Sequence, residues 1–282
     1  MEEKTIEKAP DRLEVLKKIE EYEKKGLFDV DVENDPPTKE LLPNQIDYLR
    51  KKLTSKIKRK FAYSMARKFM NKLIKDKILR IKEINGIQNW QNVKSGAIIT
   101  CNHFNALDSF AMQITYEKTN PKRKKMYKVI REGNYTNFPG FFGMIFKNCN
   151  TLPLSSNKQT MKKFLSAVET ILKHGDYILV YPEQSMWWNY KKPKPLKNGA
   201  FKFAVENDVP VVPCFITMND SGDIGPDGFY IQEYTINVFE PLYANKNLSK
   251  KDQIQDLLDR NFECWKNCYE HTYNKKLEYT TK

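Results

Sequence analysis

The sequence predicts an α/β fold: a mostly parallel central sheet flanked by helices, with an N-terminal helical extension. From about residue 78 onward, short apolar runs typical of buried strands alternate with stretches of helical periodicity, and this alternation favours a parallel sheet. Residues 1–77 instead carry only helical patterns. We therefore divide the chain into a basic, helical extension (1–77) and an α/β domain (78–282).

The extension contains three helical patterns. Residues 10–25 keep a helical period and end at Gly26, and Pro43 opens a second helical stretch through residue 57. Residues 56–77 are the most basic part of the chain, and they place Phe61, Met65 and Phe69 on an apolar face. Such a helix suits an anionic lipid surface. Alternatively, its apolar face packs on the domain and its lysines are solvated.

The domain is predicted element by element. Strands are expected at 78–84, 97–100, 126–130, 151–154, 177–181, 210–216 and 229–239. Helices are expected at 106–117, 159–173 and 199–206, and Ser249 is expected to cap a closing helix.

The net charge of +13 points to an anionic partner. We expect an anionic membrane surface rather than nucleic acid, because no nucleic-acid-binding signature accompanies the charge. The N-terminus is polar without a signal-peptide pattern, and no apolar run reaches the ~18 to 20 residues of a spanning helix. The five cysteines form no Cys-x-x-Cys pair, so we expect neither a disulfide framework nor a zinc site. We expect a peripheral protein on the cytoplasmic face of a membrane.

A histidine and an aspartate flank a predicted strand-to-helix turn. Strand 97–100 leads into His103, and Asp108 opens the next helix. The Asp108 carboxylate is placed to hold one imidazole nitrogen, which leaves the other nitrogen of His103 free to take a proton. The chemistry this pair favours is deprotonation of a substrate hydroxyl that then attacks an activated acyl group. The alternative is a hydrogen-bonded structural histidine at a helix start.

A second polar stretch follows strand 177–181. Glu183 is expected at the same sheet edge as His103, where it accepts a hydrogen bond from a substrate hydroxyl or holds a loop amide. Trp187 and Trp188 suit a lipid-binding rim, although packing under a loop is the alternative. Further on, Gly199 lets a backbone amide approach an anion at a helix N-terminus.

Four short boxes, in order, resemble the glycerolipid acyltransferase family, the lysophosphatidate acyltransferase-like group with a His-x4-Asp box. They are Asn102 to Asp108, Pro182-Glu183, Lys197-x-Gly199-Ala200 and Val209 to Pro213. The likeness covers roughly residues 78–243. It implies that His103 is the general base and that Asp108 orients it. The acceptor hydroxyl would attack the thioester of acyl-CoA or acyl carrier protein, without a metal, a cofactor or a covalent acyl-enzyme.

Two boxes depart from the family pattern. Gln184-Ser185-Met186 stands where the family has Gly-Thr-Arg, and Ser155-Ser156 stands where a second box ends in arginine. The resemblance implies that those arginines bind the acceptor's phosphate. The acceptor therefore stays open between a lysophospholipid-like or glycerol-phosphate molecule and a non-phosphate one, a glycolipid or an amine. The lysines that could replace the arginines are Lys158, Lys191, Lys192, Lys194 and Lys197. The substrate-binding candidates are Asn102, Glu183, Gln184, Ser185, Lys197, Gly199 and Ser156.

Two rival functions are weighed against acyl transfer. A non-catalytic, membrane-binding scaffold is motivated by the missing arginines. A hydrolase with Ser185 as nucleophile is disfavoured because Ser185 lies in no Gly-x-Ser-x-Gly elbow. Finally, the apolar stretch 138–146 either walls an acyl-chain tunnel, dips into the bilayer surface, or is ordinary core.

Overall fold

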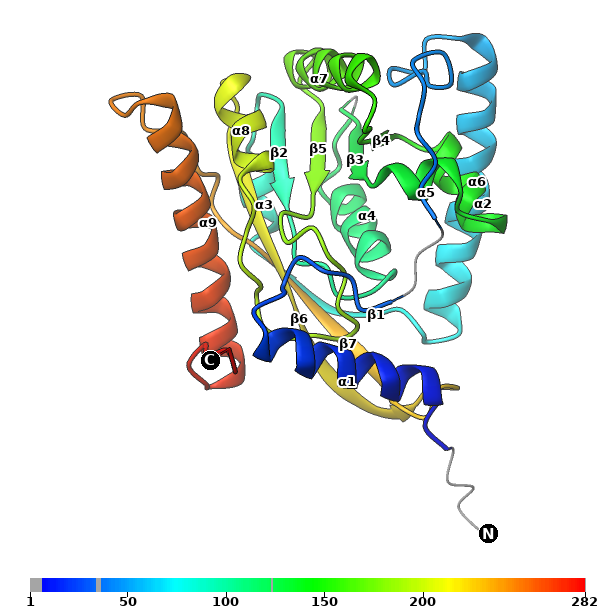
Figure 1. Ribbon diagram of the computed structural model, residues 1–282, viewed down its shortest axis with the longest axis vertical. Helices are drawn as coiled ribbons and strands as arrows, with labels where there is room; N and C mark the ends of the chain where they lie inside the picture. The colour runs from blue at the N-terminus through cyan, green and yellow to red at the C-terminus, as the bar shows by residue number, and fades with distance from the viewer. Residues whose placement is uncertain (1–6, 34–36, 123, 282) are drawn as a thin grey trace.

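The computed structural model describes residues 7–33, 37–122 and 124–281. Its strands form one sheet in the order β1-β7-β6-β2-β5-β3-β4 (Figure 1). Neighbouring strands run parallel except for the antiparallel pair β6 and β7. The strands are β1 (Arg80–Asn85), β2 (Ala97–Thr100), β3 (Met126–Ile130), β4 (Thr151–Pro153), β5 (Tyr177–Val180), β6 (Val211–Ile224) and β7 (Tyr230–Val238). The predicted α/β class, with a mostly parallel sheet, is confirmed.

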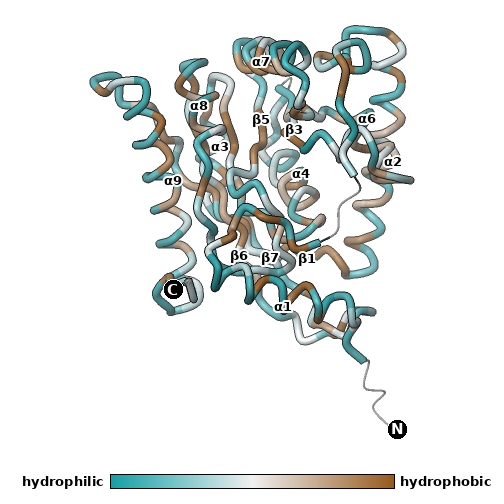
Figure 2. The backbone as a smooth tube through the Cα atoms, in the orientation of Figure 1, coloured by the Kyte–Doolittle hydropathy of each residue, from teal (hydrophilic) through white to brown (hydrophobic). Residues whose placement is uncertain are grey.

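Helices cover both faces of this sheet. They are α1 (Pro10–Lys24), α2 (Leu53–Lys75), α3 (Ile87–Gln91), α4 (Asp108–Lys118), α5 (Glu132–Thr136), α6 (Gly140–Asn148), α7 (Lys158–Lys173), α8 (Gly199–Glu206) and α9 (Lys250–Tyr273). Ile98 packs in the core cluster that includes α7 and α8, whereas its neighbour Ile99 packs in the cluster that includes α4. Both are fully buried. A strand buried on both faces has no polar side, which explains the continuous apolar runs of the sequence (Figure 2).

The predicted strands and longer helices of the domain are found within a few residues of their expected ends, with one exception. The strand β6 extends eight residues beyond the predicted end, because its exposed second half forms an antiparallel ladder with β7. Three short helices, α3, α5 and α6, were not predicted. Each spans nine residues or fewer, which is too short for a helical period to stand out.

The helical stretch predicted to open at Pro43 is wrong. Residues 43–52 form no helix, and α2 begins only at Leu53. The Asp47 carboxylate accepts hydrogen bonds from the backbone N–H groups of Lys51 (3.1 Å) and Lys52 (3.0 Å). It thereby holds the chain in a turn just before the helix starts.

The N-terminal helix α1 packs on the domain together with residues 27–33, which we call the strap. Phe28 and Val32 of the strap form one buried cluster with Val15 and Ile19 of α1 and with Trp187 and Trp188. The two tryptophans are 0% and 9% exposed. The predicted lipid-binding rim is therefore wrong at these positions, and the alternative of packing under a loop is correct.

Three further expectations meet the structure differently. The polar N-terminal residues 1–6, where a signal-peptide pattern was sought, lie outside the described residues. Within the described ranges, no helix has the length and apolar character needed to cross a bilayer. The division of the chain at residue 77 stays a prediction.

Candidate active site

Three neighbouring parallel strands deliver polar residues to one edge of the sheet. The strands β2, β5 and β3 lie side by side in that order, and their carboxyl ends lead to His103, Glu183 and Arg131 respectively. In open α/β sheets, ligands bind in the crevice outside this carboxyl edge. The site predicted from the sequence is therefore assembled at the edge where the fold places binding crevices.

His103 and Asp108 are in direct contact. The Nδ1 atom of His103 lies 2.7 Å from Oδ2 of Asp108. The same oxygen accepts hydrogen bonds from the backbone N–H groups of Phe104 (3.0 Å) and Asn105 (3.3 Å). Asp108 is fully buried, whereas 26% of the His103 side chain is exposed. The carboxylate thus orients the ring, and its second nitrogen is left without a protein partner among the hydrogen bonds of the described residues.

The His103 ring also rests on an aromatic neighbour. The Tyr181 ring stacks on it with centroids 4.2 Å apart and an interplanar angle of 22°. Burial raises the pKa of the Tyr181 hydroxyl well above its ordinary value, and the Asp108 charge adds to the effect. The tyrosine therefore stays neutral beside the histidine and confines its ring plane. The sequence motif did not single out this residue.

Glu183 holds two loops together at the same edge. Its Oε2 accepts the backbone N–H of His103 (2.9 Å), and its Oε1 accepts the backbone N–H of Lys194 (2.8 Å). The side chain is 2% exposed, and burial raises the pKa of its carboxyl group. Of the two roles considered from the sequence, the structure therefore shows the loop-holding one. Each of its two oxygens accepts a backbone N–H of the fold.

A buried lysine and a buried serine extend the hydrogen-bond network of Glu183. The Nζ atom of Lys194 donates to the backbone oxygen (2.8 Å) and the hydroxyl (2.6 Å) of Ser185, and it lies 3.9 Å from Glu183 Oε2. Burial lowers the pKa of Lys194 to about 8. Ser185 is 0% exposed and donates its hydroxyl to the Phe28 carbonyl oxygen (2.5 Å). Its hydroxyl is thus committed to the fold, which argues against both a substrate contact and the hydrolase alternative.

Asn102 is likewise occupied by the fold. Its side-chain amide donates to the carbonyl oxygen of Ile216 (3.0 Å) and accepts from the N–H of the same residue (2.8 Å). With 2% of its surface exposed, it joins the end of β2 to β6. It fixes the backbone just before His103 rather than contacting a substrate.

The remaining candidates lie nearer the surface. Gln184 is exposed and has a left-handed backbone (φ 64°), and Lys197 pairs with Asp29 at 2.8 Å. A Cβ atom placed on Gly199 would meet nothing within 4 Å, so the space beside its Cα atom is open. Ser156 is exposed, but its N–H donates to the Glu132 carboxylate (3.1 Å).

Four of the five candidate replacement lysines already make contacts within the protein. Lys194 and Lys197 are described above. Lys192 pairs with Glu23 at 2.6 Å, and Lys191 lies over the Tyr273 ring at 5.7 Å. The fifth, Lys158 at the start of α7, is exposed, and its side chain makes no ion pair or hydrogen bond with the described residues. Sequence reasoning also missed Asp29 and Asp31, because the strap carries no motif, and Arg131, which follows β3 outside every motif.

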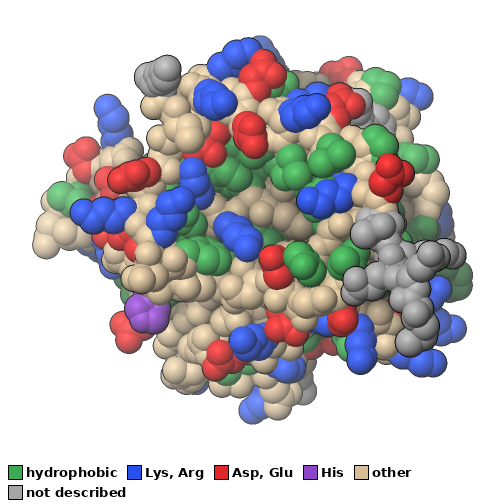
Figure 3. All heavy atoms as spheres, turned by 90° about the horizontal axis from the view of Figure 1, so that it is seen from below, with side chains coloured by type: hydrophobic (Ala, Val, Ile, Leu, Met, Phe, Trp, Pro, Cys, Tyr) green, Lys and Arg blue, Asp and Glu red, His purple; other side chains and the backbone are tan. Residues whose placement is uncertain are grey.

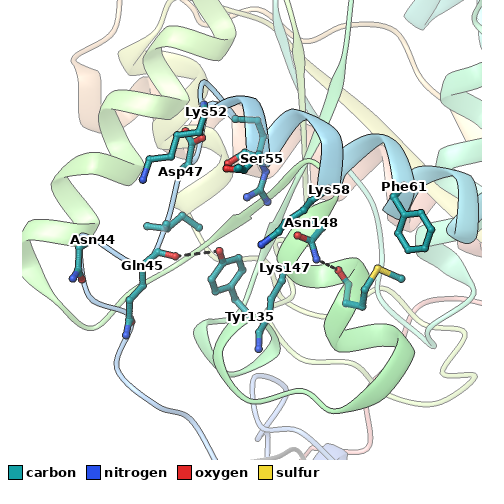
Figure 4. Close-up of a pocket in the computed structure, with 14 residues that line it drawn as sticks. Asn44, Gln45, Asp47, Lys52, Ser55, Lys58, Phe61, Tyr135, Lys147 and Asn148 are labelled. Atoms are coloured by element: carbon teal, nitrogen blue, oxygen red, sulfur yellow. Dashed lines mark hydrogen bonds between the residues drawn. The ribbon is translucent and has the colours of Figure 1, made fainter.

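The described residues contain no group of three His, Cys, Asp or Glu side chains that could hold a metal ion. A cavity of about 570 Å³ lies elsewhere, between the start of α2 and helices α5 and α6. Figure 4 shows Lys58 of α2 and Lys147 of α6 reaching into it.

The family model described as Acyltransferase matches residues 81–217. These residues therefore carry an acyltransferase domain. The acyltransferase match contains His103, Asp108, Glu183 and Lys197. No curated protein matches the chain significantly.

Among solved structures, the acyltransferase chain is similar to the crystal structure of the 1-acyl-sn-glycerophosphate (LPA) acyltransferase PlsC from Thermotoga maritima. The identity is 18%, the match covers 79% of this chain and 81% of that chain, and the TM-score is 0.48.

Proposed function

We propose that this acyltransferase moves a fatty acyl group from an acyl thioester, acyl-CoA or acyl carrier protein, to a hydroxyl of a lysolipid acceptor. The observation that carries the proposal is the 2.7 Å contact between His103 Nδ1 and the buried Asp108 carboxylate. A histidine held in this way presents its other nitrogen to the crevice as a general base.

The reaction follows from that arrangement. The free nitrogen of His103 takes the proton of the acceptor hydroxyl as its oxygen bonds to the thioester carbonyl carbon. The Asp108 carboxylate stabilises the imidazolium that forms. When the tetrahedral intermediate collapses, the carbon–sulfur bond breaks and the thiolate takes the proton from His103. The products are an ester and a free thiol, and no cofactor or acyl-enzyme takes part.

An aromatic cluster beside the site suits the acyl chain. Phe69 of α2 contacts Phe110 of α4 and Phe141 and Phe142 of α6, with ring centroids 5.0 to 5.8 Å apart. These rings are only partly buried. Because α4 begins at Asp108, Phe110 places the cluster within the first helical turn after Asp108. We assign it as a wall for the acyl chain, the first of the alternatives for stretch 138–146.

The helix α2 is proposed as the membrane-docking element, on the cytoplasmic face. Leu53, Ile57 and Phe61 recur every four residues and are 73%, 62% and 64% exposed. An apolar stripe of this kind, edged by lysines and arginines, suits an anionic bilayer surface. The cavity at the start of α2 adds Lys52, Lys58 and Lys147 beside Phe61 (Figure 4), a setting that suits lipid phosphates.

The test of the catalytic proposal is transfer from palmitoyl-CoA or palmitoyl carrier protein to a mixed lysolipid extract, followed by lipid mass spectrometry. His103→Gln should lose at least about a hundredfold in rate, since general-base groups contribute ~10²- to 10⁴-fold, and it should keep the unfolding temperature of the parent.

His174→Gln is the matched control. His174 also contacts an aspartate, Asp176, at 3.1 Å, but it precedes β5 at the opposite edge of the sheet and should keep full activity. A His103→Gln variant that retains more than a tenth of the rate would refute the general-base role. Absence of transfer with either donor would favour the non-catalytic scaffold.

The membrane proposal is tested by sedimentation with anionic vesicles. Replacing Lys58, Arg59 and Lys60 by glutamine should weaken binding, and raised salt should weaken binding of the parent. The same three-charge change at Lys246, Lys250 and Lys251, near the start of α9 on the other side of the sheet (Figure 1), is the control. Vesicle binding that changes neither with salt nor with the α2 substitutions would overturn the electrostatic part of the membrane proposal.

A further inference from the structure

The strap forms a fixed part of the wall around the candidate site. The Phe28 ring lies against Trp187 with centroids 5.6 Å apart, and Val32 is 1% exposed. Two hydrogen bonds also join the strap to residues 186 and 187. Trp187 Nε1 donates to the Val30 carbonyl (2.8 Å), and the Met186 N–H donates to Asp31 Oδ1 (3.3 Å). Buried apolar anchors and several hydrogen bonds hold the strap in one place, so it is not a loosely lying cover.

The strap brings two carboxylates to two cations at the carboxyl edge. Asp29 Oδ2 lies 2.8 Å from Lys197 Nζ, and Asp31 contacts Arg131 Nη1. The Lys197 charge holds the pKa of the Asp29 carboxyl below its ordinary value. Asp29 is therefore negative near neutral pH. Asp29 and Asp31 are each bound to a group that would otherwise attract an anion.

These pairs lie close to His103. Lys128 of β3 is level with Leu179 of β5, and Val180 of β5 is level with Thr100 of β2. Arg131 therefore follows β3 two strands away from His103, about 10 Å at the usual strand spacing. On the other side, the Lys197 N–H donates to the Pro182 carbonyl (2.9 Å), next to Glu183. A lipid head group held at His103 would reach both pairs.

The other described cations of this crevice are also engaged. Lys194 is buried with Glu183 and Ser185, and Lys128 Nζ donates to the carbonyl (2.7 Å) and hydroxyl (2.9 Å) of Ser109. Seen from below the sheet, acidic and basic side chains are interspersed around an apolar hollow, and neither sign forms a continuous patch (Figure 3). An anionic head group would find no surplus of positive charge here.

We propose that Asp29 and Asp31 determine acceptor specificity: they make the site select a lysolipid whose head group carries no net negative charge, zwitterionic or uncharged. The inference rests on the proposed acyl transfer and names its acceptor class. The chain supplies its own carboxylates at the cations that an acceptor phosphate monoester would need. These ion pairs are partly exposed, 24% to 47% by side chain. The pairs contribute little to stability. The role that we assign to their carboxylates is to repel an added anion.

The test compares two acceptors with the same acyl chain, lysophosphatidate and lysophosphatidylethanolamine, in wild type and in the double variant Asp29→Asn/Asp31→Asn. Wild type should prefer lysophosphatidylethanolamine. In the variant, the ratio of kcat/KM for lysophosphatidate over lysophosphatidylethanolamine should rise at least about tenfold, because two like charges beside the bound phosphate are removed. Asparagine keeps the acceptor oxygen for the Met186 N–H, so the unfolding temperature should stay within a few degrees.

The matched control is Asp208→Asn, another exposed aspartate paired with a lysine, Lys246, but located before β6 at the opposite edge of the sheet. It should leave the ratio unchanged. A wild-type preference for lysophosphatidate, or an unchanged ratio in an active double variant, would overturn the inference and leave the acyl transfer standing. If no acceptor is acylated in a His103-dependent way, the proposed function itself fails, and the inference fails with it.

Discussion

Glu183→Gln tests the role of a residue that the motif alone leaves ambiguous. In the folded protein both carboxylate oxygens accept backbone N–H groups, from His103 and from Lys194. Glutamine offers one oxygen and one NH₂ group, so one of these N–H groups would face another donor. A hydrogen bond to a charged group contributes ~1.5 to 3 kcal/mol. The substitution also removes the carboxylate nearest to the buried Lys194 ammonium, and breaking a buried ion pair costs ~3 to 5 kcal/mol.

Because both losses fall in one network, they do not add in full. Lys194 also keeps its hydrogen bonds to Ser185. We therefore expect a destabilisation of about 3 kcal/mol, or roughly 6 to 12 °C in Tm for a chain of this size.

The assay pairs thermal unfolding at pH 7 with initial rates measured well below the Tm of the variant. The control is Glu206→Gln, an exposed residue whose only salt bridge, to Lys202, spans 3.7 Å; it should change the stability by less than about 0.5 kcal/mol. A Glu183→Gln protein that keeps its Tm within 2 °C and yet loses activity would refute the reasoning. That result would return Glu183 to the role of a substrate ligand.

Three further predictions concern the surroundings of the same pair. Tyr181→Leu should lower kcat about tenfold with little change in KM, because it removes the ring stacked on His103. Tyr181→Phe keeps the ring, so its kcat should stay within about threefold of wild type. Equal losses in both variants would contradict this prediction. Gln184→Gly should raise stability by about 0.5 to 1 kcal/mol in urea unfolding, since Gln184 sits at φ 64°, where a side chain is strained, and an unchanged or lower midpoint would contradict it. Burial lowers the pKa of Lys194 from its ordinary value of 10.5 to about 8. Between these two pH values Lys194 is protonated in the unfolded chain but largely neutral in the folded protein. The free energy of unfolding therefore rises with pH through this group. Lys194→Met should lack that rise, so the Tm gap between wild type and variant should widen from pH 7.5 to 9.5; a constant gap would contradict the assignment.

The sheet and the contact between His103 and Asp108 were predictable because local signals determine them. Continuous apolar runs identify strands buried on both faces, and the spacing of His103 and Asp108 fits a strand-to-helix turn in which the carboxylate reaches back to the ring. Parallel strands meet at one carboxyl edge whatever their order in the sheet. Glu183 could therefore be placed at the same edge as His103 from the sequence. The two residues meet because β2 and β5 are also neighbours in the sheet.

The direction of each polar side chain was not predictable in the same way. Asn102, Glu183 and Ser185 stand in the boxes that resemble a catalytic family, yet their polar atoms bind Ile216, two loop amides and the strap. Apart from the Lys194 amide, which lies 11 residues from Glu183, these contacts join segments 80 to 157 residues apart. Spacing along the chain carries no information about those contacts.

The strap is the reverse case, in which residues without a sequence motif lie at the candidate site. Residues 27–33 contain no motif and lie in the part of the chain that composition assigns to an extension, but Asp29 and Asp31 meet two cations at the carboxyl edge, Lys197 and Arg131. The missing arginines pointed to an altered acceptor site without saying how it was altered. The geometry supplies a physical alternative to the simple loss of a phosphate site: Lys197 and Arg131 are paired with carboxylates of the same chain. A chain that had merely lost phosphate binding would leave those cations open to solvent, and neutralising Asp29 and Asp31 would then change the rate for neither acceptor.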